Sequence, residues 1–190
     1  MLLLVGLGNP GSNYTNTRHN IGFKIIDAIN VHFKLSKQKP KFKGLLTTGN
    51  IDEKKIYAIK PLTFMNNSGT AIKELIDYFK IDAKNVFVFH DDMDIDFGKI
   101  KAKFGGSSAG HNGIESIDKF IGKDYSRVRI GIGHPKQKKK VNNHVLEDFK
   151  DDEEEKINEI TDNIVKQLPT LIEKKIDLFS SKVNQDLNGI

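Results

Sequence analysis

The sequence predicts an α/β protein, a three-layer α/β/α domain with a twisted, mostly parallel mixed sheet and a helical C-terminal cover. Short apolar runs typical of buried strands alternate along the chain with segments whose apolar residues recur at helical spacing. Polar residues gather where the apolar runs end, and residues 151–190 have a helical pattern. We expect a single domain over residues 1–190, because this length suffices for one hydrophobic core.

These patterns predict each element in chain order. We expect a strand at 2–7, a helix at 21–33, a hairpin of strands at 44–51 and 55–60, a helix at about 68–80, strands at 86–90 and 99–104, a helix at about 111–121, and a strand at 126–133. Asn16 or Thr17 is the expected N-cap of the first helix, which places Arg18 and His19 in its first turn.

The C-terminal segment begins with five consecutive acidic residues, Asp151 to Glu155. Negative charge at a helix N-terminus is stabilised by the helix dipole, so a helix is expected to begin here. Pro169 is expected to kink or break this helix, because proline removes a backbone donor and its ring collides with the preceding turn. A shorter helix should then end near Leu187.

Composition narrows the class of protein. Cysteine is absent, which excludes disulfides, thiolate metal sites and a cysteine nucleophile. The apolar start is too short for a signal peptide or a membrane span, so we expect a cytoplasmic protein that does not engage a membrane. No exposed apolar repeat demands a partner subunit, and we expect a monomer.

Charge is distributed unevenly along the chain. The net charge of +5 divides into +10 for residues 1–150 and −5 for residues 151–190. A basic body with a sequence pI of about 9.2 indicates a polyanionic partner, because neutralising phosphates releases counterions. A solvated lysine surface would have the same composition.

The most informative stretch is Gly6-Leu7-Gly8-Asn9-Pro10-Gly11, at the end of the first predicted strand. Pro10 restricts Asn9 to extended conformations, so this turn holds the Asn9 side chain in place. The glycines also match the dinucleotide pattern G-x-G-x-x-G, but Pro10 interrupts the path to the helix and the first acidic residue, Asp27, comes too early. A nicotinamide or flavin site is therefore disfavoured, and no cofactor is expected.

Several polar side chains are expected at one edge of the sheet. Ligands of open α/β sheets bind beyond the carboxyl ends of the strands, where loops here supply Asn9, Asn66, Asp91 and, at a helix start, Asn112. His19 lies close to the first of these loops. A histidine can accept a proton from water while a carboxylate orients its ring, so His19 and Asp91 would be a base and its orienter. Asparagines suit a polar, uncharged ligand because each offers a donor and an acceptor.

Other features have competing interpretations. Four carboxylates beyond the strand at 86–90 would bind Mg²⁺ or form an ordinary turn: Asp91, Asp92, Asp94 and Asp96. The stretch 106–110 matches G-x-S-x-G, so Ser108 would be the nucleophile of a serine hydrolase, although such short patterns recur by chance.

Two further alternatives concern nucleic acid. Four lysines would contact phosphates or belong to a surface loop: Lys136, Lys138, Lys139 and Lys140. A non-catalytic RNA-binding protein would share the basic body and would bind RNA with a strong salt dependence, but it would catalyse no reaction.

Motifs that are weak singly occur together over nearly the whole chain. They are Gly6-Leu7-Gly8-Asn9-Pro10-Gly11 with Tyr14, Thr17-Arg18-His19-Asn20, Thr63-Phe64-Met65-Asn66 with Ser68-Gly69, His90-Asp91, Gly110-His111-Asn112-Gly113, Arg129, and Gly131-Ile132-Gly133-His134-Pro135. In these motifs and their order the chain resembles the bacterial-type peptidyl-tRNA hydrolases.

The resemblance implies hydrolysis of the ester between a peptide's C-terminus and the terminal ribose of tRNA, which frees the tRNA for translation without a metal. By matching position, His19 would activate the attacking water and Asp91 would orient His19. Asn9, Asn66 and Asn112 would hold the peptide and the ester, with Asn112 also placed to position water or stabilise charge. The remaining implied contacts are Tyr14, Phe64, Met65 and His111 near the terminal adenosine or the nascent peptide, and Lys101, Lys103 and Arg129 at acceptor-stem phosphates.

Overall fold

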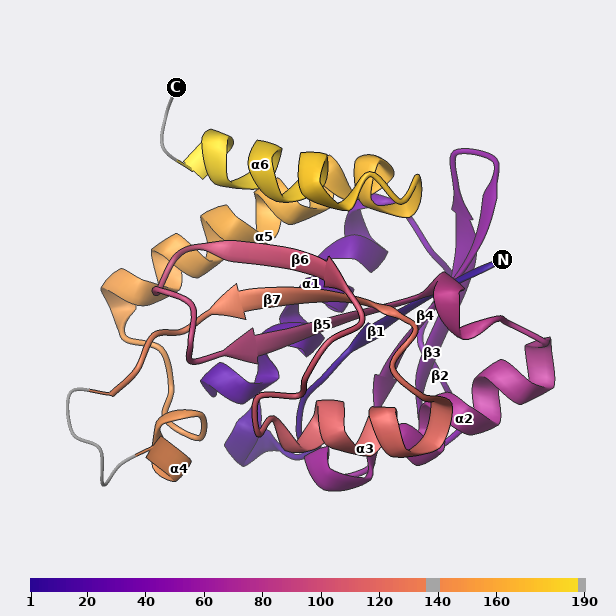
Figure 1. Cartoon of the computed structure of the whole chain (residues 1–190), viewed down its shortest axis with the longest axis horizontal. Helices are drawn as coiled ribbons and strands as arrows, with labels where there is room; N and C mark the ends of the chain where they lie inside the picture. The colour runs from indigo at the N-terminus through magenta and orange to yellow at the C-terminus, as the bar shows by residue number, and fades with distance from the viewer. Residues whose placement is uncertain (136–140, 188–190) are drawn as a thin grey trace.

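A seven-stranded mixed sheet forms the centre of the computed structural model, which describes residues 1–135 and 141–187 (Figure 1). The strands are β1 (Leu2–Gly6), β2 (Lys39–Lys41), β3 (Gly44–Ile51), β4 (Lys54–Pro61), β5 (Val86–Asp92), β6 (Ile100–Phe104) and β7 (Ser126–Gly131). Their order is β2-β3-β4-β1-β5-β7-β6. The strands β4, β1, β5 and β7 are mutually parallel, while β3 and β6 run antiparallel to their neighbours.

Helices cover both faces of this sheet. They are α1 (Ile21–His32), α2 (Ser68–Phe79), α3 (Asn112–Ile121), α4 (Val141–His144), α5 (Asp151–Ile172) and α6 (Ile176–Leu187). Helices α1, α5 and α6 pack on one face, and α2 and α3 pack on the other. The predicted three-layer α/β/α fold with a helical C-terminal cover is confirmed.

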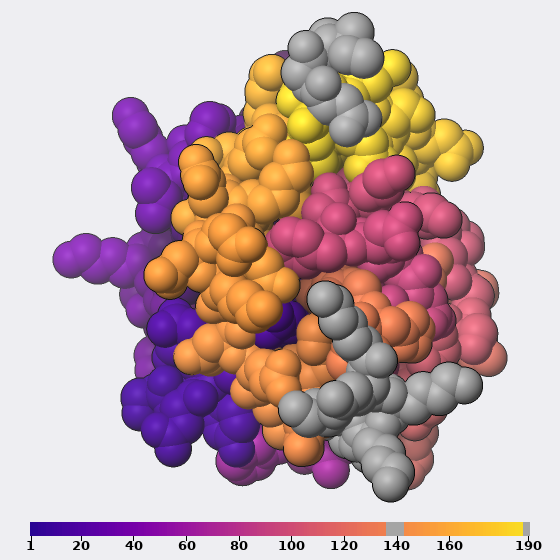
Figure 2. Space-filling view, turned by 90° about the vertical axis from the view of Figure 1, so that its left-hand side faces the viewer, coloured from indigo at the N-terminus to yellow at the C-terminus, as the bar shows by residue number. Residues whose placement is uncertain are grey.

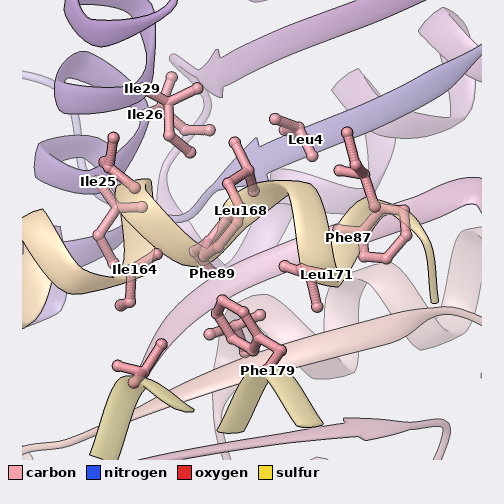
Figure 3. Close-up of a cluster of buried hydrophobic side chains, with 14 of the residues drawn as sticks. Leu4, Ile25, Ile26, Ile29, Phe87, Phe89, Ile164, Leu168, Leu171 and Phe179 are labelled. Atoms are coloured by element: carbon pink, nitrogen blue, oxygen red, sulfur yellow. The ribbon is translucent and has the colours of Figure 1, made fainter. Parts of the chain in front are cut away.

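Successive side chains of the central strands point to opposite faces of the sheet and so contribute to two separate cores. In β1, Leu4 packs toward α1 and α5, whereas its neighbours Leu3 and Val5 pack toward α2 and α3. Figure 3 shows the first core, where Phe87 and Phe89 of β5 meet apolar side chains of the C-terminal helices. Because β1 and β5 are buried on both faces, the loops at their carboxyl ends are attached to rigid supports.

The start of the first helix differs from the prediction. Arg18, His19 and Asn20 form a separate 3₁₀ turn, with Thr17 at its N-cap, and α1 begins only at Ile21. Tight turns of this kind are common at helix starts. This turn holds His19 in a buried position, where its side chain contacts Asp91 of β5.

Other boundaries also shifted. Strand β5 extends through Asp91 and Asp92, so these carboxylates belong to the strand and do not follow it. The short elements β2 and α4 carry no sequence pattern and were not predicted. None of the described helices is long and apolar enough to cross a membrane.

The expected break at Pro169 is wrong. Helix α5 continues beyond Pro169 to Ile172, and α6 then ends at Leu187 as predicted. Leu168, Leu171 and Ile172 on either side of the proline are buried in the first core. Their packing stabilises the last turn of α5 and outweighs the hydrogen bond that proline cannot make.

Candidate active site

The polar residues predicted for the sheet edge line a cavity of about 550 Å³. Its walls come from the ends of β1 and β5, the 3₁₀ turns at 18–20 and 65–67, the start of α3, and the segment after α4. The predicted residues that line it are Asn9, His19, Phe64, Met65, Asn66, Asp91, His111 and Asn112. Segments more than 100 residues apart in the chain are therefore brought together here.

Two of the lining residues, His19 and Asp91, form a pair. His19 Nδ1 lies 2.8 Å from Asp91 Oδ1, and both residues are buried, with 7% and 2% of their surface exposed. An ionised carboxylate only accepts hydrogen bonds, so the proton of His19 lies on Nδ1, which donates a hydrogen bond to Asp91. The Nε2 atom of His19 is therefore the nitrogen left with a lone pair when the ring is neutral.

A second histidine, His111, contacts the same carboxylate oxygen. Its Nε2 lies 3.0 Å from Asp91 Oδ1, and its ring centroid is 5.0 Å from that of His19. On the other side of the ring, Nδ1 accepts hydrogen bonds from the backbone N–H groups of Gly113 and Ile114 and so caps α3. A ring nitrogen that accepts a hydrogen bond carries no proton. The proton of His111 therefore lies on Nε2, which donates a hydrogen bond to Asp91.

We call His19, Asp91 and His111 the His-Asp-His cluster. One ligand atom from each residue lies within 4.8 Å of the others, which is close enough to consider a metal ion. The hydrogen bonds oppose this use, because the nitrogens that face Asp91 both carry protons and have no lone pair for a metal. For His111 to bind a metal through Nε2, it would have to lose its cap on α3.

Electrostatics within the cluster shift the pKa values in opposite directions. Burial acts to lower the pKa of His19, but the charge of Asp91 and its hydrogen bond outweigh burial and raise this pKa above its ordinary value. Burial acts to raise the pKa of Asp91, whereas the two histidines lower it well below its usual range. Asp91 is thus ionised at neutral pH, and its charge makes the His19 ring easier to protonate than an ordinary histidine.

Asn9 is held at both its backbone and its side chain. The Asn20 side chain accepts from Asn9 N–H at 2.8 Å and donates to Asn9 C=O at 2.9 Å. Asn9 Oδ1 accepts from the backbone N–H of Met65 at 2.9 Å. With its oxygen occupied in this way, Asn9 offers the two N–H groups of Nδ2 to a ligand.

Sequence reasoning assigned no task to the Asn20 side chain. It follows His19 in the same 3₁₀ turn and binds the backbone of Asn9, so it links the expected base to the expected amide donor. The available signal was its place in the motif Thr17-Arg18-His19-Asn20. Its partner lies 11 residues earlier in the chain, which no periodicity predicts.

Residues after α4 form one wall of the cavity. Val145 C=O accepts from the backbone N–H of His19 at 2.8 Å, and Val145 and Leu146 line the cavity. The buried Arg18 donates to the carbonyls of Glu147 and Asp148 and forms an ion pair with Glu153. Figure 2 shows this face, where the N-terminal residues (indigo) meet the segment leading into α5 (orange).

Basic side chains lie beside the cavity on β6 and β7. Lys101 is exposed and Lys103 half-buried on β6, and these two residues pair in register with Arg129 and Arg127 of β7. Arg129 Nε donates to Asp92 Oδ2 at 2.7 Å, and Asp92 lines the cavity. Partial burial, together with Arg129 and Arg127, lowers the pKa of Lys103. We call Lys101, Lys103 and Arg129 the basic strip.

Not every predicted site residue lies in the cavity wall. Tyr14 lies in a 3₁₀ turn outside the cavity lining, where its carbonyl accepts from Thr17. The Ser108 hydroxyl contacts Glu115 at 3.3 Å on a loop, with no histidine bonded to it among the described residues. Ser108 therefore lacks the partner that a serine nucleophile requires.

The aspartates do not converge on a common point. Asp92 pairs with Arg129, and Asp94 pairs with His134, while Asp91 faces the two histidines. Carboxylates engaged with these separate partners do not form the oxygen cage that Mg²⁺ requires. The lysines at 136 and 138–140 lie outside the described residues.

Comparisons with known proteins identify the family of the chain. The family model for peptidyl-tRNA hydrolase matches residues 3–189. The chain is 71% identical to the peptidyl-tRNA hydrolase of Pelagibacter ubique over 97% of this chain and 99% of that one, and 47% identical to that of Ehrlichia ruminantium over 95% and 93%. The crystal structure of peptidyl-tRNA hydrolase from Acinetobacter baumannii superposes with a TM-score of 0.90 at 34% identity, covering 97% of this chain and 94% of that one.

The fold and these comparisons thus define the class of the protein as an α/β hydrolytic enzyme. The chain belongs to the peptidyl-tRNA hydrolase family.

Proposed function

We propose that this protein hydrolyses the ester between the peptide C-terminus and the terminal ribose of peptidyl-tRNA, with His19 as general base and Asp91 as its orienter. Membership of the family supports the reaction. The observation that supports the assignment of the base is the proton arrangement of the His-Asp-His cluster, which leaves the lone pair of His19 on Nε2. We place this reaction in the cytoplasm and expect a monomer to perform it.

In the first step a water molecule attacks the ester carbonyl carbon and transfers a proton to His19 Nε2. The positive ring that forms is stabilised by Asp91, which accepts from Nδ1 at 2.8 Å. In the second step the bond between this carbon and the ribose oxygen breaks, and the ribose oxygen takes the proton back from Nε2. The products are a peptide carboxylic acid and a tRNA with a free terminal hydroxyl.

The carbonyl oxygen becomes negative in the intermediate and needs hydrogen-bond donors. We assign this role to Asn9 Nδ2, because Asn9 Oδ1 is already bonded to Met65 N–H. The N–H groups of Gly113 and Ile114 at the start of α3 are bonded to His111 and do not compete for the role. Asn66 and Asn112 line the same cavity and would hold the peptide amides.

The tRNA moiety would contact the basic strip. Lys101 and Lys103 form no ion pair with a carboxylate among the described residues, so their charges are available for acceptor-stem phosphates. Phe64 follows β4 on the opposite side of the cavity, has 59% of its surface exposed, and would contact the nascent peptide. With the basic strip as its contact, the acceptor stem would lie on the β6–β7 side of the reacting ester.

The test uses purified protein with N-acetylated aminoacyl-tRNA, unblocked aminoacyl-tRNA, and the blocked substrate in EDTA. We expect release of the amino acid from the blocked substrate alone, with no loss in EDTA. His19→Ala should lower kcat by about 10²–10⁴-fold, the usual contribution of a general base. His32→Ala is the matched control, because His32 is exposed on α1.

Retained activity in a folded His19→Ala variant would exclude the assigned base. Binding of tRNA by the wild type without ester release would instead favour an RNA-binding protein over an enzyme.

A further inference from the structure

A second cavity adjoins the active site and has no part in the mechanism above. It measures about 460 Å³ and shares Asn9 with the first cavity. Its wall combines apolar side chains with polar groups of the turn after β1: Pro10, Phe23, Leu45 and Leu62 with Ser12, Thr15 and Asn16. We call it the Asn9–Leu62 cavity.

The charges of the Asn9–Leu62 cavity are already neutralised. The buried Lys60 donates to both oxygens of Asp27, at 2.6 and 2.7 Å, and also lies 5.6 Å from the centre of the Phe23 ring. Lys24 forms an ion pair with Glu154. A phosphate here would meet two lysines that are each paired with a carboxylate, so this wall does not favour a polyanion. The mixed apolar and polar lining suits an uncharged peptide segment.

The position of the Asn9–Leu62 cavity also favours a peptide segment as its ligand. Leu45 and Lys60 belong to β3 and β4, on one side of β1, whereas the basic strip lies on β7 and β6, beyond β5 on the other side. Asn9 and Asp91, at the ends of β1 and β5, lie between the two regions. An ester held at Asn9 and His19 with its tRNA toward β6 directs its peptide toward β4.

We propose that the Asn9–Leu62 cavity binds the nascent peptide, from about the second to the fourth residue counted from the ester, and that Leu62 is one of its contacts. This proposal rests on the proposed function. Three extended residues span roughly 10 Å, and the two cavities adjoin at Asn9. The cavity thereby favours substrates with a peptide longer than one residue.

The experiment measures whether the peptide reaches Leu62. Two N-acetylated tetrapeptidyl-tRNAs share the residue at the ester and carry Lys or Glu at the third and fourth positions from it. The variant Leu62→Asp places a negative charge in the cavity wall at a side chain that is 40% exposed, so the fold should tolerate it. Leu178→Asp is the matched control, since Leu178 is 45% exposed on α6.

At low ionic strength, Leu62→Asp should shift the ratio of kcat/KM for the Lys substrate over the Glu substrate toward Lys by roughly threefold to tenfold, the combined effect of one attraction and one repulsion of exposed ion-pair size. Leu178→Asp should leave this ratio at the wild-type value.

An unchanged ratio in Leu62→Asp would overturn the proposal. So would an equal loss for both peptides that also extends to N-acetylated aminoacyl-tRNA, since that pattern would mean that tRNA occupies the cavity. Failure of the proposed function gives a different result, in which the wild type hydrolyses none of the three substrates.

Discussion

The His-Asp-His cluster and the basic strip lie on neighbouring strands but are constructed differently. In the cluster every side chain is held by hydrogen bonds to a defined partner, and Asp91 is only 2% exposed. In the strip Lys101 is exposed, Lys103 is half-buried, and within residues 1–135 and 141–187 only Arg129 has a carboxylate partner. The cluster fixes the position of protons, whereas the strip supplies positive charge with freedom to move.

Electrostatic interactions in the buried cluster and in the exposed strip should therefore affect different kinetic constants. Burial strengthens each electrostatic interaction in the cluster and makes its geometry costly to disturb, so substitutions there should act on kcat. Exposed charges interact weakly and are screened by salt, so substitutions in the strip should act on KM and on the salt dependence. The following variants test this division, beginning with the largest expected effect.

Asp91→Asn should lower kcat/KM by about 10²–10⁴-fold, because His19 loses the partner that orients it. The acidic limb of the pH–rate profile should also move to lower pH. With His19 as the proposed base, activity should fall as pH decreases through the pKa of His19, and the charge of Asp91 raises that pKa while burial lowers it. Without the charge of Asp91, burial lowers the pKa of His19 with no attraction to offset it.

Complete pH–rate profiles of both proteins measure this shift. Asp92→Asn is the control, since Asp92 pairs with Arg129 and does not bond to His19. An acidic limb that stays in place in Asp91→Asn would contradict the coupling between Asp91 and His19.

Asn20→Ala should lower kcat by about tenfold with little change in KM, because Asn9 loses both of its backbone anchors and its amide is no longer aligned with the ester. The free energy of unfolding should fall by about 1–3 kcal/mol, since two buried backbone groups lose their partners. Steady-state kinetics and denaturant unfolding test both effects against Asn13→Ala, a change at an exposed asparagine. A loss of stability with unchanged kcat would make Asn20 purely structural.

Replacing Lys101 and Lys103 together with alanine should raise KM and leave kcat nearly unchanged. The slope of log KM against log salt concentration should decrease by about 0.7–0.9 for each tRNA phosphate that a lysine no longer neutralises. The double variant Lys37→Ala with Lys39→Ala removes the same charge from an exposed region at β2 and is the control. If both double variants gave the same slope, the effect would come from net charge and not from the strip.

The smallest effect is expected at His90, which lies beside the cluster without taking part in it. His90 Nδ1 contacts the carbonyl of Asp91 at 2.7 Å, and burial, with His111 nearby, holds the pKa of His90 well below its ordinary value. As pH falls below about 6.5, the unfolded chain binds a proton that the native His90 does not, so stability decreases.

His90→Asn should therefore reduce the loss of stability between about pH 6.5 and 5, because the titrating group is removed. Unfolding free energies at several pH values, compared with those of His32→Asn at an exposed site, measure this. An unchanged pH dependence would show that His90 does not contribute to it.

Sequence patterns predicted the layers, the hairpin and most element boundaries, because burial leaves a periodic record. They also placed Asn9, Asn66, Asp91 and Asn112 at one edge of the sheet, since the carboxyl ends of parallel strands coincide there. The family resemblance then supplied roles that no periodicity contains.

The rest depends on contacts between segments distant in the chain. The hydrogen bond from His111 to Asp91 is made by the same side chain that caps α3. The position of the Asn20 side chain depends on a turn that is 3₁₀ and not α-helical. Pro169 was misjudged because the packing of Leu171 and Ile172 lies outside any local rule. Strand β2 is too short and too polar to leave a pattern.

The most direct test of the central claim is the tautomeric state of the histidines, read from ¹⁵N NMR of the imidazole nitrogens at a pH above the pKa of His19. Signals can be assigned with His19→Asn and His111→Asn. We predict that His19 carries its proton on Nδ1 and that His111 carries its proton on Nε2. A His19 ring protonated on Nε2, or a His111 ring protonated on Nδ1, would contradict the assignment of His19 Nε2 as the atom that accepts the proton from water.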